Sequence, residues 1–362
     1  MSAAGHAGSA PDASAIAARL RDADFVRLFA TPDGDALAAT GLLARALAAC
    51  DVAYQASVTH DPGATDADLT VAVGHRTGDL ELVDAPLAVA AHAVARELGA
   101  PPDATLALAG VVAAGAVPGA HADLLSASGL ERRPGLAVPT DDVAEGLAHT
   151  TLAHASFSGD PEATARALAG VDREGRTLAS LLALSTVEDA TGAPRAAGAV
   201  ERALRPYVTD GPFETLGGFA DVLDAVARSS PGVGVALALG HDCRDAALSA
   251  WRDHAQAAHE AVRATDRERY DGLVVVRPRL DDVGALDTVA RLVRDFRSPE
   301  PVVLALCERR AAVAGVEDVT TLVSETAAAT GGRATGRGSR VHVDLDDDPE
   351  PFVETLKRGV SR

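Results

Sequence analysis

Lysine, aromatic residues and cysteine are all scarce in this chain of 362 residues. Lys357 is the only lysine, and Phe, Trp and Tyr together make up 3% of the sequence. Cys50, Cys243 and Cys307 show no pairing pattern, so we expect neither a disulfide framework nor a cysteine-based zinc site. No uninterrupted apolar run of about 18 residues occurs, which argues against a membrane span.

Acidic residues dominate the charge of the chain. There are 52 Asp and Glu against 33 Lys and Arg, giving a net charge of −19. A chain rich in Asp, Glu and Ala and poor in Lys is typical of a halophilic host, where carboxylates keep the surface solvated. This charge argues against broad phosphate neutralisation at low salt. At molar salt the Debye length is only about 3 Å, so local arginine contacts still work.

Alternating strand and helix patterns predict the fold. Residues 1–20 lack a basic start and an apolar centre, so we expect a mobile tail rather than a signal peptide, and a cytoplasmic protein. Strand patterns at 25–30, 52–58 and 68–74 alternate with helical patterns, which predicts an α/β domain with a parallel, doubly wound sheet over residues 21–265. A helical region spans 141–207, and a long helix at 244–269 can bridge to a smaller α/β domain at 266–362.

Two carboxylates two residues apart give the first chemical signal. Asp33 and Asp35 lie in the turn between a buried strand and an Ala/Leu-rich helix. In an open α/β sheet such a turn lines the crevice at the carboxyl ends of the strands, where ligands bind. Carboxylate oxygens suit Mg²⁺ or Mn²⁺. The alternative is a plain turn and helix cap, since Asp commonly bonds nearby backbone N–H groups.

A second signal is the sequence TGGRATGRGS at 330–339. Its glycines let backbone N–H groups approach an anion, and Arg333, Arg337 and Arg340 can pair with phosphate. We therefore expect a loop that contacts nucleic acid, with a flexible surface loop as the alternative.

The segment from Asp33 to Leu47 resembles the first motif of the DHH phosphoesterase family, which includes RecJ-type exonucleases. The family histidine that precedes the first Asp falls on Thr31. The 330–339 segment resembles the glycine-rich loop with which the family's C-terminal domain binds nucleic acid, with Arg337 and Gly338 where a His is common. The resemblance covers most of residues 22–362. It implies the following nucleic-acid-binding residues: Gly331, Gly332, Arg333, Gly336, Arg337, Gly338 and Arg340.

Several family motifs are altered. The Asp expected at the end of the second strand falls on Gly74, the Asp-His-His string is absent, and the fourth motif offers only Ala114 and Gly115. The remaining metal candidates are Asp33, Asp35, His75 and Asp84. Because the family holds two metal ions with several carboxylates and histidines, these losses weaken any Mn²⁺ or Mg²⁺ centre.

Three hypotheses follow from the resemblance and the charge of the chain. The first is a catalytically degenerate RecJ-like protein, like the relatives that join GINS and MCM in the archaeal replicative helicase complex, with single-stranded nucleic acid or replication proteins as partners. The second is a metal-dependent single-strand exonuclease or phosphoesterase with rearranged ligands, favoured by the retained Asp pair. The third is an acidic scaffold that binds no nucleic acid, favoured by the net charge. The first two are distinguished by whether Asp84 and His75 converge on Asp33 and Asp35.

Overall fold

The structure, a computed structural model, describes residues 12–63, 65–84, 86–172, 174–189 and 193–361. A four-stranded parallel sheet in the order β2-β1-β3-β4 forms its N-terminal part. The strands are β1 (Phe25–Ala30), β2 (Ala53–Val58), β3 (Leu69–Val73) and β4 (Leu80–Leu82). Ala30 lies opposite both Val58 and Val73, so the carboxyl ends of β2, β1 and β3 meet on the same side of the sheet.

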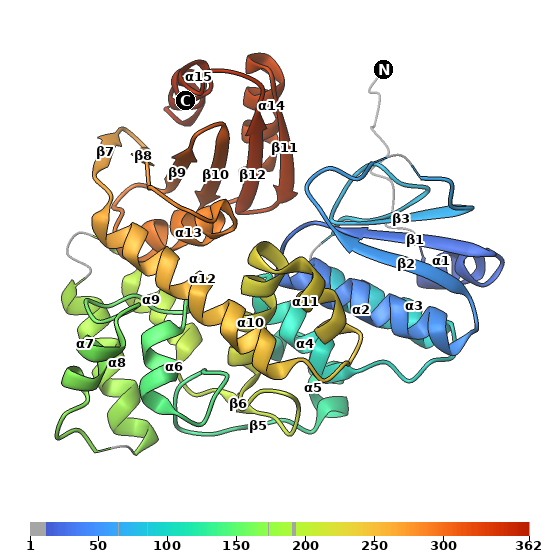
Figure 1. The fold of residues 1–362 in the computed structure, drawn as a ribbon, viewed down its shortest axis with the longest axis horizontal. Helices are drawn as coiled ribbons and strands as arrows, with labels where there is room; N and C mark the ends of the chain where they lie inside the picture. The colour runs from blue at the N-terminus through green and yellow to red at the C-terminus, as the bar shows by residue number, and fades with distance from the viewer. Residues whose placement is uncertain (1–11, 64, 85, 173, 190–192, 362) are drawn as a thin grey trace, which may run out of the picture.

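Helices built from small residues surround this sheet, some on its strands and others on the helices that cover them (Figure 1). They are α1 (Ala13–Arg21), α2 (Gly34–Ala49), α3 (Leu87–Glu97), α4 (Ala104–Ala113), α10 (Leu216–Ser229) and α11 (Pro231–Ala238). Nearly all of α2 is buried, including Leu37, Leu42 and Leu43. Because aromatic residues are few, Ala and Gly on α2, α4 and α10 let the helices approach closely around a core of Leu and Val.

A mostly helical region follows, as predicted. It comprises η1 (Pro118–Ala120), α5 (Ala122–Ser128), α6 (Val143–His149), α7 (Pro161–Ala167), α8 (Gly175–Asp189), α9 (Ala196–Val200) and η2 (Glu201–Ala203). Two short strands, β5 (Glu131–Arg132) and β6 (Tyr207–Val208), pair antiparallel. The long helix α12 (Arg244–Ala264) then leads to the C-terminal domain (Figure 1).

The C-terminal domain has a six-stranded sheet in the order β11-β12-β10-β9-β8-β7. Its elements are β7 (Arg267–Tyr270), β8 (Leu273–Val276), η3 (Val283–Ala285), α13 (Leu286–Phe296), β9 (Val302–Cys307), β10 (Arg310–Gly315), α14 (Thr320–Thr330), β11 (Gly332–Arg337), β12 (Arg340–Leu345) and α15 (Glu350–Val360). Alternate residues of β8 face opposite sides. Val274 shares a core with α13 and the helical region, whereas Val275 shares one with α14 and α15.

The predicted fold class, a parallel α/β domain with a smaller C-terminal α/β domain, is confirmed. No described strand joins the two sheets, and the predicted boundary near residue 265 lies between α12 and β7. In the predicted tail, residues 1–11 lie outside the described residues, and the segment from Ala13 is helical instead. Within the described ranges, no helix is long and apolar enough to cross a membrane.

One element of the sequence prediction is wrong: the segment 330–339 is not a loop. Gly331 ends α14, residues 332–337 form β11, and only Gly338 and Ser339 make the turn to β12. Strand β11 pairs with β12 along its whole length, from Gly332 opposite Leu345 to Arg337 opposite Arg340. It is an edge strand of Gly, Arg and Thr without alternating apolar residues, so its sequence carries no strand signal.

Candidate functional site

Asp33 and Asp35 start helix α2 directly after strand β1. Asp33 is the N-cap, and its carboxylate accepts a hydrogen bond from the Ala36 N–H at 3.0 Å. Asp35 is fully buried and accepts hydrogen bonds from the N–H groups of Leu87 at 2.8 Å and Ala88 at 2.9 Å, at the start of α3. Both carboxylates are therefore fixed at the carboxyl edge of the sheet, as the sequence predicts, and Asp33 also serves as a cap.

A guanidinium group from the other domain lies on this carboxylate pair. Arg337, at the end of β11, donates from Nη1 to Asp33 Oδ2 at 3.0 Å and from Nη2 to Asp33 Oδ1 at 2.9 Å. Nη2 also donates to Asp35 Oδ2 at 3.0 Å, and Nη1 to Thr31 Oγ1 at 3.2 Å. The Thr31 hydroxyl in turn donates to Asp33 Oδ2 at 2.6 Å. The bidentate geometry is the strong form of an arginine–carboxylate pair.

Gly74 makes room for this guanidinium. Its φ is +86°, and a Cβ placed there would lie 2.8 Å from Arg337 Nη1 and 2.3 Å from Thr31 Oγ1. Gly74 is the position on which the family's second Asp falls. The guanidinium of Arg337 therefore fills the space into which a side chain at position 74 would extend.

One guanidinium group faces two carboxylates in this site, so it compensates their charge in part. Burial would raise the pKa of Asp33, but the charge and hydrogen bonds of Arg337 lower it to about 2. Burial raises the pKa of Asp35, and the Arg337 charge opposes that rise. Burial disfavours the charged form of Arg337, yet Asp33 and Asp35 raise its pKa overall. The three groups form a buried, hydrogen-bonded cluster in which the Arg337 charge favours the ionised form of Asp33.

These carboxylates do not fit a metal ion as they stand. Each carboxylate oxygen offers about two lone pairs. Both oxygens of Asp33 already accept two hydrogen bonds each, from Ala36, Thr31 and Arg337. Asp35 is engaged by two backbone N–H groups and by Arg337. The guanidinium thus supplies the positive charge that two adjacent carboxylates require.

The other predicted metal ligands do not complete a cluster. His75 is buried, and its Nε2 lies 2.9 Å from the Thr59 carbonyl oxygen. This nitrogen is therefore engaged in a hydrogen bond rather than directed at a metal ion. Asp84 is exposed, although it lines the same cavity of about 430 Å³ as Asp33. Across the described residues, no group of three or more His, Cys, Asp or Glu side chains could hold a metal. Asp33 and Asp35 lie together and Asp84 lines the same cavity as Asp33, so the assignment of Asp33, Asp35, His75 and Asp84 to a metal site stays a prediction.

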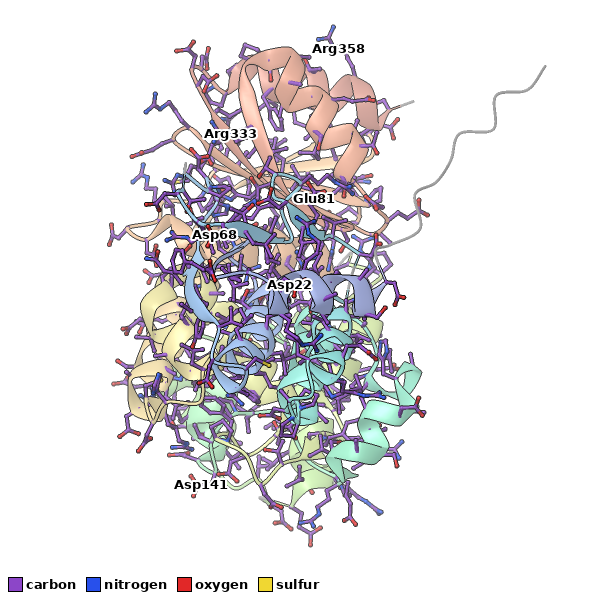
Figure 2. The ribbon with its side chains drawn as sticks, turned by 90° about the vertical axis from the view of Figure 1, so that its right-hand side faces the viewer. Asp22, Asp68, Glu81, Asp141, Arg333 and Arg358 are labelled. Atoms are coloured by element: carbon purple, nitrogen blue, oxygen red, sulfur yellow. The ribbon has the colours of Figure 1, made fainter. Side chains whose placement is uncertain are left out.

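The three arginines predicted to bind nucleic acid lie in different environments. Arg333 is exposed and pairs with Asp61 at 2.5 Å, and Figure 2 shows it among the surface side chains. Arg337 is held by the Asp cluster. Arg340 pairs with Asp224 at 3.5 Å and donates to the Ala113 carbonyl. The segment does face Asp33, as expected, but all three of its arginines are already bonded to protein groups, and only the Arg333 pair is exposed.

Sequence analysis missed a further buried carboxylate beside this site, that of Asp224. Asp224 of α10 accepts a hydrogen bond from the Gly34 N–H at 2.9 Å and pairs with Arg228 at 2.6 Å. Burial raises its pKa, but Arg228 and Arg340 lower it overall. The available signal was a charged residue on the apolar face of an amphipathic helix, because a carboxylate there needs a partner.

A histidine pair also joins the two domains. The rings of His60, after β2, and His342, on β12, stack with centroids 4.0 Å apart. His342 Nδ1 lies 3.1 Å from Asp287. Burial would lower the pKa of His342, but Asp287 and Asp344 raise it to about 9. Burial and the charge of His342 lower the pKa of His60 to about 4. At neutral pH one ring is charged and the other is neutral.

Comparison with known proteins gives a full-length relative. The chain is 47% identical over 361 residues to the uncharacterized protein rrnAC1427 of Haloarcula marismortui, covering 95% of this chain and 96% of that protein. Residues 264–358 match a family model described as the C-terminal domain of uncharacterized protein rrnAC1427. This match begins where α12 ends.

Solved structures share the fold at low sequence identity. RecJ of Thermus thermophilus in complex with Mg²⁺ is 18% identical with a TM-score of 0.52, covering 97% of this chain and 52% of that one. An exonuclease RecJ bound to manganese has a TM-score of 0.50 at 16% identity, covering 97% and 94%. CDC45 from Entamoeba histolytica has a TM-score of 0.56 at 10% identity, covering 97% and 99%. The chain thus spans about half the length of the Thermus RecJ.

Proposed function

This chain belongs to the family of the haloarchaeal protein rrnAC1427 and has a RecJ-like DHH fold, and we propose that it works as a non-hydrolytic RecJ-like subunit of a replication complex. Its partners are replication proteins of the GINS and MCM type, together with single-stranded nucleic acid held weakly. In this role the protein does not carry out metal-dependent hydrolysis of nucleic acid.

The observation that carries the proposal is the guanidinium of Arg337 on Asp33 and Asp35. Two-metal hydrolysis needs carboxylates with free lone pairs around adjacent dications. Here a permanent cation holds them, and it comes from the C-terminal domain, 304 residues along the chain from Asp33. The same contact fixes the C-terminal domain against the sheet, which suits a protein whose task is to present a defined surface.

The fold comparison is equally compatible with an assembly role and with an exonuclease. The CDC45 structure is matched over 99% of its length, and the manganese-bound exonuclease RecJ over 94% of its length. Degenerate RecJ relatives act as subunits beside GINS and MCM, as the sequence resemblance implies. Because identity to these structures is low, the likeness concerns the fold, and the assembly role rests on the altered site.

The decisive experiment combines catalysis and assembly. The wild-type chain and the Asp33→Ala plus Asp35→Ala variant are incubated in molar KCl with Mn²⁺ and a labelled single-stranded oligonucleotide. We expect no hydrolysis above that of the double variant. In parallel, the chain is mixed with purified GINS and MCM from the same host and analysed by size-exclusion chromatography, where co-elution is expected. Robust hydrolysis that the double variant abolishes would overturn the proposal, as would failure to co-elute with either protein.

The retained Asp pair favours a second candidate, a metal-dependent single-strand exonuclease or phosphoesterase in which Arg337 moves away when metal binds. Asp84, which shares a cavity with Asp33, would then be the next available ligand. Calorimetry with Mn²⁺ separates the candidates. The proposal requires no Asp33-dependent heat in the wild type, whereas Arg337→Met should gain weak Mn²⁺ binding because it releases both carboxylates. Tight Mn²⁺ binding by the wild type would favour the exonuclease.

A further inference from the structure

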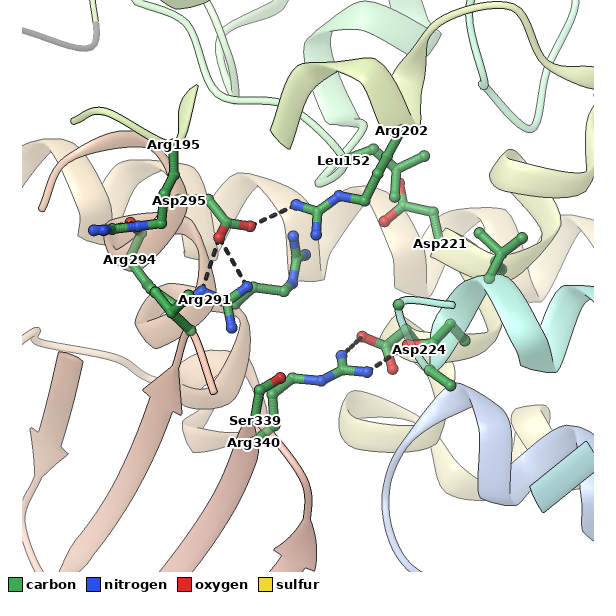
Figure 3. Close-up of a pocket in the computed structure, with 16 residues that line it drawn as sticks. Leu152, Arg195, Arg202, Asp221, Asp224, Arg291, Arg294, Asp295, Ser339 and Arg340 are labelled. Carbon is green, nitrogen blue, oxygen red and sulfur yellow. Dashed lines mark hydrogen bonds and ion pairs between the residues drawn. The ribbon is translucent and has the colours of Figure 1, made fainter. Parts of the chain in front are cut away.

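A second cavity, separate from the Asp33 cluster, lies where three parts of the chain meet. It has a volume of about 220 Å³. It is bounded by the end of α4, by α9 and η2 of the helical region, and by α13 and the start of β12 in the C-terminal domain (Figure 3). Five arginines line it: Arg195, Arg202, Arg291, Arg294 and Arg340.

Fewer carboxylates than guanidinium groups face this cavity. The carboxylates are those of Asp221, Asp224 and Asp295. Arg202 and Arg294 share Asp295, with N–O distances of 2.5 and 2.8 Å, as Figure 3 shows. Asp224 is shared between Arg340 and Arg228. This concentration of positive charge stands in a protein whose net charge is −19.

Arg291 is buried here without a direct ion pair, although the charges of Asp295 and Asp224 raise its pKa. It is 7% exposed, and both its terminal nitrogens donate to Thr151, to the carbonyl at 3.0 Å and to the hydroxyl at 2.8 Å. It forms no ion pair with any described carboxylate. Burial and the nearby charge of Arg202 lower the pKa of Arg291 to about 10, still well above neutrality. The three carboxylates of the cavity do not balance its five buried or half-buried arginines, so an anion bound there would be stabilising.

Two further groups in the cavity, Arg195 and Asp221, are not paired with each other or with another charged side chain among the described residues. Arg195 donates to the carbonyl oxygens of Arg294, Ser298 and Glu300, all of them neutral acceptors. Asp221, the third carboxylate, bonds Thr151 and Trp251 rather than an arginine, and burial raises its pKa. Asp221 reaches Arg291 through the Thr151 hydroxyl, to which both are bonded, and its charge acts on Arg291 across that contact.

We propose that this cavity binds a small tetrahedral dianion, either free phosphate or the phosphate of a small phosphomonoester. Arginine forks match phosphate oxygens in bidentate geometry. Cavities that hold drug-sized ligands measure about 300–1,000 Å³, so this one suits a small anion rather than a polymer. Because its walls come from all three regions of the fold, the bound anion would hold them together. This site goes beyond the proposed function and does not depend on it.

Calorimetry with inorganic phosphate tests the site directly. The full chain is titrated in molar KCl at about pH 8, where phosphate is mainly the dianion. Sodium acetate at matched ionic strength serves as the monoanion control, and glycerol phosphate as the ester. We expect saturable phosphate binding and none of acetate. Competition by glycerol phosphate assigns the site to phosphomonoesters, and its failure assigns it to the free ion.

Two variants remove the charge from different sides of the cavity. Arg202→Gln and Arg291→Gln should each weaken phosphate binding by about tenfold or more. Phosphate should raise the melting temperature of the wild type and of the control Arg166→Gln, whose side chain is 70% exposed, but not that of Arg291→Gln. In buffer without phosphate, Arg291→Gln should melt no lower than the control, because it removes one of the positive charges that the three carboxylates of the cavity do not balance.

Two results would overturn the site. One is the absence of phosphate heat and of any phosphate-dependent melting shift in the wild type. The other is unchanged phosphate affinity in both variants. If Arg291→Gln melts lower than the control in buffer without phosphate, Arg291 acts as a structural anchor for Thr151, and the proposal fails on that ground as well.

Discussion

Replacing Arg337 by Met tests the central contact of this structure. The methionine side chain keeps much of the arginine's volume but removes the charge and the hydrogen bonds to Asp33 and Asp35. The arginine and Asp33 side chains are 17% and 16% exposed, and that of Asp35 is fully buried. Removing one partner of a buried ion pair costs about 3–5 kcal/mol, because the remaining charges lose compensation.

The pKa of Asp33 gives an independent magnitude. Its fall from 3.8 to about 2 corresponds to about 2 kcal/mol of stabilisation, at about 1.4 kcal/mol per pKa unit. We therefore expect Arg337→Met to lower the free energy of unfolding by about 3 kcal/mol at neutral pH. The control Arg333→Met breaks an exposed pair and should cost less than about 1 kcal/mol.

The pH dependence gives the sign of the effect. A carboxyl group whose pKa is lowered on folding stabilises the protein above its unfolded pKa, and this contribution is lost as the pH falls through the folded value. In the wild type the Asp33 contribution is therefore present above pH 3.8 and lost towards pH 2. In Arg337→Met the burial of both Asp33 and Asp35 raises their pKa values. The deficit of the variant should therefore shrink as the pH is lowered from neutrality.

Urea unfolding followed by circular dichroism, in molar KCl from neutral to acidic pH, measures both effects. Adding Asp33→Asn to Arg337→Met should recover part of the loss, because it removes one uncompensated charge. The reasoning is refuted if Arg337→Met unfolds at the same urea concentration as Arg333→Met. It is also refuted if the deficit of Arg337→Met is independent of pH.

Three further predictions concern other parts of the molecule. The affinity for an oligonucleotide should depend weakly on salt, with a slope of about −0.7 per contacted phosphate. Arg333→Ala should lower this affinity more than Arg358→Ala, because both side chains are exposed but only Arg333 lies on β11. Equal affinities of the two variants in filter binding would show that β11 does not contact the oligonucleotide. Because the pKa of His342 is raised on folding, this residue stabilises the folded state fully below pH 6.5, and the contribution is lost as the pH rises to about 9. His342→Gln should therefore reduce the change in the free energy of unfolding with pH over that range. An unchanged pH dependence in urea unfolding would contradict the contact with Asp287. Gly34→Ala would place a Cβ 2.9 Å from the Asp224 backbone nitrogen and 2.8 Å from the Ala113 Cβ, costing about 1–3 kcal/mol in thermal unfolding; wild-type stability would mean that α10 can shift.

The strand-turn-helix at Asp33, the parallel sheet and the separate C-terminal domain could all be predicted from the sequence. The reason is that each depends on local patterns. Buried parallel strands are continuous apolar runs, helices show their own period, and an Asp before a helix caps it. The altered positions Thr31 and Gly74 were likewise visible by comparison with the DHH motifs.

The partner of the Asp pair was decided by tertiary structure alone. Arg337 lies in an edge strand whose Gly, Arg and Thr residues give no periodic signal, and it reaches Asp33 only because the β11–β12 hairpin packs against the edge of the N-terminal sheet. The arginine-lined cavity has the same origin, since Arg195 comes from the helical region whereas Arg291 and Arg340 come from the C-terminal domain. The local sequence determines whether each element is a helix or a strand. Long-range packing determines which charged side chains lie in contact, and in this protein those contacts decide what the Asp33 site and the arginine-lined cavity can bind.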